Sequence, residues 1–322
     1  MNAIKIEEIS YKNRHRLKHF FEGNKYSPYS ALRLYTDAGK LTAYYYEQVF
    51  SNKIIRILSA VKRDTIVGLL IYYISDWDSK IFEIKMANIE VIMAAGGYTA
   101  ELMIKNKLLK ELISRAKDMK IKHLSIRVDM RDLSSAHAVE LNGFRIIDSL
   151  FTYILKNRLI NIPSMKNMFN IRKIRREDIK ESGDLFADRY VTGHYSVDPR
   201  IPSDKAKNMY RMWLENKFKD HVNNDIFIAE RSGKIVGCSM FSFDNLLKKY
   251  TGLNSVHRGL VAVEPSAAGC LVAFIKAQIE KRKNLDFAEF ETQGHNYRML
   301  QAMQKLGMQI TRSRYTFHKV IA

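Results

Sequence analysis

The stretch that decides the fold is GLVAV-EPSAAG-CLVAFIKAQIEKRK, residues 259–283, followed by FAEFETQ at residues 287–293. Residues 259–263 read as a strand and 264–269 as a turn of small residues. Residues 270–283 read as a helix, because their apolar side chains recur with a period near 3.6. A second strand, Gly294-His295-Asn296 and a further helix follow. A small-residue turn that enters a helix leaves backbone N–H groups free to bind an anion such as a pyrophosphate.

The chain repeats itself, which predicts one domain type used twice. Residues 60–68 (AVKRDTIVG) match residues 229–237 (AERSGKIVG), and each reads as a β-hairpin. Three matches follow in the same order at similar offsets. They are the helix segments around Leu108 and Phe274, the Gly143 and Gly307 turns, and the last strands of the two halves, Phe151-Thr152-Tyr153 and Tyr315-Thr316-Phe317.

The repeat predicts an α/β (α+β) protein of two tandem domains, residues 1–160 and 168–322. Each half reads as helices, a hairpin, a third strand, a long helix, a strand, a helix and a last strand. This order predicts a mixed, mostly antiparallel sheet flanked by helices, with the halves paired as an intramolecular pseudo-dimer. Residues 159–170 contain Pro163-Ser164, keep no regular period and are the expected linker.

Composition excludes several protein classes. The chain has 322 residues, of which 46% are hydrophobic and 11% aromatic, as in folded globular proteins. No stretch is long enough to span a membrane, and the first residues lack the apolar core of a secretory signal. Cys238 and Cys270 are the only cysteines, which excludes a disulfide framework and favours the cytoplasm.

The formal net charge of +19 attracts anionic partners. The basic residues are spread over both halves, with no Lys/Arg run interleaved with aromatic residues of the kind that stacks bases. We therefore expect an anionic small molecule, not nucleic acid, as the main partner. Ser-His-Asp arrangements, clusters of metal ligands and Walker-type loops are not found, so no metal is expected.

The turn at residues 264–269 resembles the pyrophosphate-binding turn of the GNAT acyltransferases, whose pattern is Gln/Arg-x-x-Gly-x-Gly/Ala. Ser266, Gly269 and Leu271 occupy the matching positions, so only the central glycine is kept. The order of elements is also that of GNAT domains. The resemblance implies a tandem GNAT fold and acetyl-CoA or another acyl-CoA as cofactor.

Further motifs resemble the bacterial dTDP-fucosamine acetyltransferase family. They are SDWDSKIF at residues 75–82, HYSVDPRIP at residues 194–202 and TQGHN at residues 292–296. The resemblance implies transfer of an acetyl or other short acyl group to the amine of a nucleotide-linked amino sugar, for surface polysaccharide. A different amine (peptide, polyamine or antibiotic) remains an alternative. A degenerate GNAT pair that binds nucleic acid or a protein partner is another.

The resemblance also implies the site. The residues expected to bind the cofactor are Val261, Ala262, Val263, Ser266, Ala267, Ala268, Gly269, Cys270, Leu271, Asn296, Met299 and Met303. The residues expected to bind the acceptor are His194, Tyr195, Arg200 and Tyr210, and Arg200 could pair with a nucleotide phosphate.

Acyl transfer to an amine needs a polarised carbonyl, a neutral amine and close positioning. Glu291 and His257 are the two candidates for the base. The family's tyrosine acid is replaced by Met303. Cys270 could be activated at a helix N-terminus, but we interpret it as a packing residue.

The first half departs further from the GNAT pattern. Asp132 and Val139 stand where the family has Asn and Tyr, and residues 100–105 (AELMIK) hold no glycine at the turn. Glu101 would repel a pyrophosphate. Gly96-Gly97 lies just upstream, so a shifted alignment could restore a turn. We expect acyl-CoA in the second half only, with the first half as a scaffold.

Overall fold

The chain forms two compact units. The computed structural model describes residues 4–17, 20–21, 29–156, 168–282 and 284–321. The first unit comprises Met1–Ser149 with Arg312–Ala322, and the second comprises Leu150–Thr311. Each unit is described by itself.

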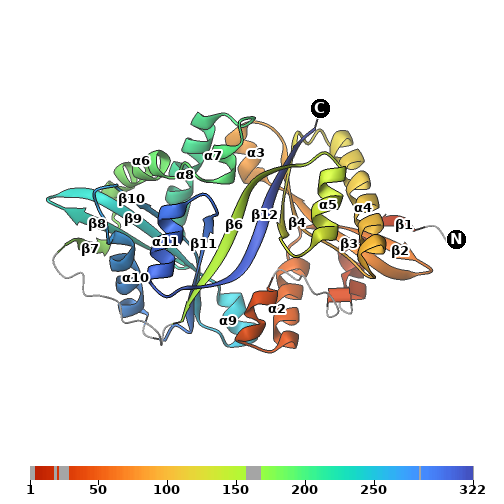
Figure 1. The fold of residues 1–322 in the computed structure, drawn as a ribbon, viewed down its shortest axis with the longest axis horizontal. Helices are drawn as coiled ribbons and strands as arrows, with labels where there is room; N and C mark the ends of the chain where they lie inside the picture. Colours follow the sequence, from red (N-terminus) through yellow and green to blue (C-terminus); the bar gives the residue numbers. More distant parts are fainter. Residues whose placement is uncertain (1–3, 18–19, 22–28, 157–167, 283, 322) are drawn as a thin grey trace. The chain divides into compact units, whose positions relative to one another are not determined.

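The first unit contains six strands in the order β1-β2-β3-β4-β5-β12 (Figure 1). Its strands are β1 (Lys5–Glu8), β2 (Arg56–Lys62), β3 (Thr65–Ile74), β4 (Met86–Ala94), β5 (His123–Asp129) and most of β12 (Gln309–Val320). Its helices are η1 (Tyr11–Leu17), η2 (Ser30–Leu34), α2 (Ala38–Phe50), α3 (Asp76–Phe82), α4 (Tyr98–Asp118) and α5 (Leu133–Leu141). Helices α4 and α5 pack their apolar residues into one core cluster with the sheet, and α2 packs into another.

The second unit repeats this plan in the order β6-β11-β10-β9-β8-β7. Its strands are most of β6 (Arg145–Lys156), β7 (Asn170–Lys173), β8 (Asn224–Arg231), β9 (Lys234–Phe243), β10 (Ser255–Val263) and β11 (Phe287–Gln293). Its helices are η4 (Arg176–Asp178), α6 (Ile179–Arg189), α7 (His194–Val197), α8 (Ser203–Lys219), α9 (Asn245–Thr251), α10 (Cys270–Lys281) and α11 (Tyr297–Lys305). In each unit one pair of strands is parallel, β4 with β5 and β10 with β11.

The predicted repeat is present in three dimensions. The two hairpins turn at Arg63-Asp64 and at Ser232-Gly233, and both central residues of each turn have positive φ, as two-residue hairpin loops require. Gly68 lies against Ile104 and Leu108 of α4, just as Gly237 lies against Cys270 and Phe274 of α10. The short helices α3 and α9, between the second and third core strands of each half, were not predicted.

The last strand of each sequence half belongs to the other unit. Residues 150–156 of β6 pair with β11, whereas residues 314–320 of β12 pair with β5. The expected contiguous domains, 1–160 and 168–322, therefore differ from the structural units because the two strands are exchanged. Most of the expected linker, including Pro163-Ser164, lies outside the described residues. In the described part of the chain, no helix is long and apolar enough to cross a membrane.

Candidate functional site

The site of the second half begins where β10 and β11 diverge. The two strands pair only through Ser255–Phe287 and Val256–Ala288. Beyond these pairs, β11 stays bonded to β6 and β10 stays bonded to β9. One edge of β10 therefore faces the opening with backbone N–H and C=O groups that β11 does not take.

A β-bulge turns β10 at this opening. His257 is paired with Ser242 and Leu260 with Met240, so two residues of β10 oppose one of β9. The bulge contains Gly259, where a Cβ atom would meet the carbonyl oxygen of Met240 at 3.1 Å. After the bulge, Val261, Ala262 and Val263 pair with β9 as the sequence predicts for a strand.

The turn at residues 264–269 leads from β10 into α10. Gly269 has φ = 91°, which is a left-handed conformation that favours glycine, and it precedes the first helical residue without a side-chain cap. Ser266 and Ala268 are exposed, whereas Ala267 is buried. Arg231 donates hydrogen bonds to the Ser266 carbonyl (3.1 Å) and hydroxyl (3.0 Å), which places a guanidinium beside the turn.

Seven of the residues expected to bind the cofactor lie in or against one core cluster. This cluster includes Val261, Ala267, Cys270, Leu271 and Met303, with Val263 and Met299 packed against it. Met303 is 1% exposed, so in this structure it is a packing residue.

Asn296 caps α11 at the end of β11. Its Oδ1 accepts a hydrogen bond from the Met299 N–H at 3.4 Å. Its backbone N–H donates to the carbonyl of Gln293 at 3.0 Å. The side chain is thereby held at the end of the strand that diverges from β10.

Cys270 is not an activated thiol. Its side chain is buried, and burial raises the pKa of the thiol to about 12. The thiolate is the nucleophilic form of cysteine. The geometry therefore supports packing and not chemistry at this position.

The two candidate bases lie on different strands of the divergence. The His257 imidazole on β10 contacts Ser255 and Glu289. Glu291 on β11 is paired with Thr152 of β6, whose hydroxyl lies 3.2 Å from Glu291 Oε1. Ser255 and Glu289 were not predicted as site residues. The sequence feature that could have identified them is the alternation of side chains along a strand. It puts Ser255 on the same face as His257, and Glu289 on the same face as Glu291.

Three of the four expected acceptor residues, His194, Tyr195 and Tyr210, lie beside Gly193. His194 and Tyr195 lie in α7, and their rings are 4.0 Å apart. Tyr195 and Tyr210 are both buried. A Cβ atom at Gly193 would come within 1.9 Å of the Tyr210 hydroxyl, so the glycine is required for this packing.

Residues 189–195, which lead into α7, contact both the end of β11 and the turn after β10. Thr192 Oγ1 lies 3.3 Å from Gln293 Oε1 at the end of β11. Arg189 forms an ion pair of 2.5 Å with Glu264 in the turn after β10. Residues 189–195 are thereby held beside the end of β11 and the turn after β10.

Arg200 is held by Asp198. Its Nε and Nη2 atoms donate to the two carboxylate oxygens at 2.8 Å each. These hydrogen bonds raise the pKa of the Arg200 guanidinium. Two donors expected for a nucleotide phosphate are therefore used within the protein, and Arg200 is an ordered part of the segment that the sequence predicts to bind the acceptor.

The first half keeps the divergence, but its turn is shorter, with only residues 95–97 between β4 and α4. The β4–β5 pairing ends at Ile89 and Ile126, and a pocket follows, lined on β4 by Glu90 and on β5 by Arg127 and Asp129. However, α4 begins directly after Gly97. Ile104 packs against Gly68 as Cys270 packs against Gly237, so Ile104 and Cys270 occupy equivalent positions. This equivalence aligns residues 98–103, which are helical, with residues 264–269, which form the turn.

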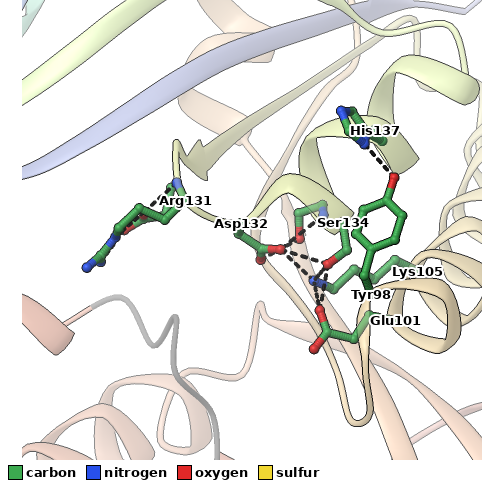
Figure 2. Close-up of polar contacts among 9 residues, drawn as sticks. Tyr98, Glu101, Lys105, Arg131, Asp132, Ser134 and His137 are labelled. Atoms are coloured by element: carbon green, nitrogen blue, oxygen red, sulfur yellow. Dashed lines mark hydrogen bonds and ion pairs between the residues drawn. The ribbon is translucent and has the colours of Figure 1, made fainter.

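A buried network joins α4 to α5 in the first half (Figure 2). Lys105 Nζ lies 2.8 Å from Asp132 Oδ1 and 2.7 Å from Ser134 Oγ. Ser134 also contacts Glu101 at 2.6 Å. An exposed contact of 2.7 Å between Tyr98 and His137 also joins the two helices. Glu101 and Lys105 stand where the second half has Ala267 and Leu271. The network links the first turns of α4 to the start of α5.

Comparisons with known proteins support the fold. No protein-family model matches the chain. The chain is similar to the spore coat polysaccharide biosynthesis protein SpsD of Bacillus subtilis (strain 168), with 23% identity over 271 residues, 81% of this chain and 86% of the relative.

Solved structures match nearly the whole chain. A tandem GNAT protein from the clavulanic acid biosynthesis pathway (without AcCoA) matches with a TM-score of 0.60 and 9% identity over 99% of each chain. A GCN5-related N-acetyltransferase from Sphaerobacter thermophilus gives a TM-score of 0.63 and 9% identity, over 99% of this chain and 96% of the other. The predicted tandem GNAT fold is confirmed.

Proposed function

We propose that this chain, which has the tandem GNAT fold, is an acyl-CoA-dependent N-acyltransferase whose second half carries the chemistry. The divergence of β10 and β11 supports this proposal most directly, because it ends at a glycine-containing turn and a helix N-terminus. Free N–H groups at that terminus and the nearby Arg231 suit a pyrophosphate. Backbone N–H groups of residues 261–263 can polarise an acyl carbonyl.

Each expected residue then has a role. Residues 261–263 and Asn296 bind the pantetheine amides, residues 266–271 bind the pyrophosphate, and Met299 and Met303 support α11 beside them. The segment with His194, Tyr195, Arg200 and Tyr210 forms the acceptor side. His257 or Glu291 removes the proton that the attacking amine must lose.

The proposed acceptor is the amine of a nucleotide-linked amino sugar, which receives an acetyl or other short acyl group during surface polysaccharide synthesis. The motifs at residues 75–82, 194–202 and 292–296 and the similarity to SpsD, a spore coat polysaccharide biosynthesis protein, support this substrate class. The net charge of +19 suits both a nucleotide and acyl-CoA. Both cysteines are free, which fits synthesis in the cytoplasm.

Another amine, such as a peptide, a polyamine or an antibiotic, is the alternative acceptor. The alternative without catalysis is a nucleic-acid or partner-binding module, which the net charge and the altered turn of the first half favour. It predicts binding of RNA without binding of acetyl-CoA.

The test uses the full chain with acetyl-CoA and a panel of dTDP-4-amino-4,6-dideoxygalactose, spermidine, a peptide with a free N-terminus and an aminoglycoside. Release of CoA thiol and the mass of the acylated product are measured. We expect the sugar nucleotide to be acylated fastest. Preference for another amine would contradict the sugar assignment, and absence of both acetyl-CoA binding and product would contradict the enzyme.

A further inference from the structure

Three side chains form a connected group at the narrow end of the β10–β11 divergence. Ser255 Oγ lies 2.5 Å from His257 Nε2, and His257 Nδ1 lies 3.5 Å from Glu289 Oε1. The Phe287 ring stands perpendicular to the imidazole at 5.8 Å. The His257 side chain is 13% exposed and that of Glu289 is 17% exposed.

The position of this group follows from the strand pairing. Val256 and Ala288 are the last paired residues of β10 and β11. His257 and Glu289 are therefore the first residues on each side of the opening. Ser255 lies on the same face as His257, one pair deeper, and is 3% exposed.

This face of the sheet is the one attached to the acceptor segment. Ala288 and Phe290 belong to the core cluster under α10, so Glu289, Glu291 and Gln293 point to the opposite face. Gln293 contacts Thr192 there. The Ser255–His257–Glu289 group thus lies on the side from which an amine would approach.

Other charged and polar groups near His257 come from three further elements, β8, β9 and α8. Ser242 of β9 is its cross-strand partner, and it bonds to Lys217 Nζ of α8 (3.2 Å) and Asn224 Oδ1 of β8 (2.7 Å). Glu291 lies two residues beyond Glu289 and contacts Thr152. Glu289 is therefore the carboxylate in contact with the imidazole.

We propose that His257 is the base and that Ser255 and Glu289 are its positioning residues. The proposal rests on the N-acyltransferase function above. Ser255 is buried at the closed end and accepts a hydrogen bond from Nε2–H, so the Nδ1 lone pair lies on the side of Glu289, at the first residues of the opening. Glu289 stabilises the imidazolium that forms when Nδ1 accepts a proton.

The step is balanced in atoms and charge. His257 Nδ1 takes one proton from the R–NH₃⁺ group, and the neutral amine attacks the thioester carbonyl carbon. The C–N bond forms, the C–S bond breaks and CoA leaves as a thiolate, which takes the second proton from nitrogen. His257 releases its proton to solvent, so the products are the amide, CoA thiol and one H⁺.

The kinetic test compares Glu289→Gln, Ser255→Ala, His257→Gln and Glu291→Gln, with Glu280→Gln on α10 (side chain 66% exposed) as the control. The assay uses acetyl-CoA and the first amine of the panel above that the wild type acylates. We expect His257→Gln to lower kcat by about 10²–10⁴-fold. Glu289→Gln and Ser255→Ala should lower kcat by about tenfold or more, with the KM for acetyl-CoA within about twofold.

Two controls separate positioning from folding. Glu289→Asp should recover part of the kcat lost in Glu289→Gln, and Glu280→Gln should match the wild type. A loss carried by Glu291→Gln, with Glu289→Gln at the wild-type level, overturns the proposal while leaving the N-acyltransferase function intact. Absence of transfer and of acetyl-CoA binding in the wild type contradicts the function itself.

A second measurement needs no substrate. Nitrogen-15 NMR of the full chain, with His257→Gln used to assign the signal, reports which ring nitrogen of neutral His257 carries hydrogen. We expect the Nε2–H tautomer in the wild type and a mixture in Ser255→Ala. An Nδ1–H tautomer in the wild type overturns the proposal whether or not an acceptor has been found.

Discussion

Lys105 lies 2.8 Å from Asp132, and both side chains are almost completely buried. Asp132 also caps α5, because its Oδ1 accepts a hydrogen bond from the Ser135 N–H at 3.0 Å. In the second half, Leu271 and Asn296 occupy the corresponding positions. The ion pair therefore joins α4 to α5 in the first half, and Leu271 and Asn296 cannot form such a pair in the second half.

This pair predicts a strong effect on stability. Removing one partner of a buried ion pair typically costs about 3–5 kcal/mol, because the other charge is left buried. We expect Lys105→Met to destabilise the protein by about this amount in denaturant unfolding, and Asp132→Asn to do the same. The double variant should lose less than the sum of the single losses. Additive losses would show that the two side chains act independently.

The difference between the two halves also predicts one acyl-CoA site per chain. Ala268→Glu places a carboxylate in the exposed turn of the second half, where it would repel a pyrophosphate. Gly97→Glu is the matched change at the start of α4, where a Cβ atom meets no neighbour within 4 Å. Calorimetric titration with acetyl-CoA should give a stoichiometry of one. Ala268→Glu should weaken binding by about tenfold or more, and Gly97→Glu should leave it unchanged.

A stoichiometry of two would contradict this prediction. So would loss of binding in Gly97→Glu together with normal binding in Ala268→Glu, because the site would then lie in the first half.

Local patterns were enough to predict the repeat, the hairpins and the tandem fold. The matched segments around Gly68 and Gly237 share both turn geometry and helix packing, which are properties of short segments. The exchange of β6 and β12 could not be read from the chain, because either last strand has a pattern that suits either sheet.

The part of the candidate site that lies in one contiguous stretch could also be predicted from the sequence. The turn at residues 264–269 is contiguous, so its residues could be named from one motif. Ser255 and Glu289 come together only through the register of β10 and β11, which the sequence does not specify. The pairing of Arg200 with Asp198 is local, but the spacing of two residues did not distinguish it from a free arginine.

Both cysteines are predicted to be unreactive in the folded protein. Burial raises the pKa of each thiol, Cys238 and Cys270, to about 12. Thiolate formation is therefore suppressed at pH 8, and only the thiolate reacts rapidly with iodoacetamide. Mass spectrometry should find neither thiol alkylated under native conditions and both alkylated in denaturant. Rapid native alkylation of Cys270 would show that the start of α10 is open to solvent.

The contact between Gly193 and Tyr210 predicts that Tyr210→Phe restores stability lost in Gly193→Ala. Gly193→Ala would push its Cβ atom against the Tyr210 hydroxyl, at 1.9 Å in the unrelaxed structure. Overpacking of this kind costs about 1–3 kcal/mol, and displacement of the acceptor segment should raise the KM for the amine. Tyr210→Phe removes the hydroxyl and leaves Cζ as the nearest ring atom, at 3.2 Å. The Gly193→Ala/Tyr210→Phe double variant should therefore be more stable than Gly193→Ala alone, and equal stability would contradict the packing argument.

The methionine at position 303 leads us to predict that the CoA thiolate leaves without help from an acid at this position. The family's tyrosine is replaced here by a methionine that is 1% exposed and packed in the core cluster with Leu271. The CoA thiol resembles that of cysteine, whose pKa is ~8.5. The CoA thiolate can therefore leave without a strong acid to protonate it. Met303→Tyr should lower the melting temperature, because a larger polar side chain enters a filled core. The kcat of the folded fraction should change by less than about threefold, whereas Met303→Leu should preserve both stability and rate. A gain of tenfold or more in Met303→Tyr would show that protonation of the thiolate limits the reaction, and the search for an acid would then turn to groups beside α11.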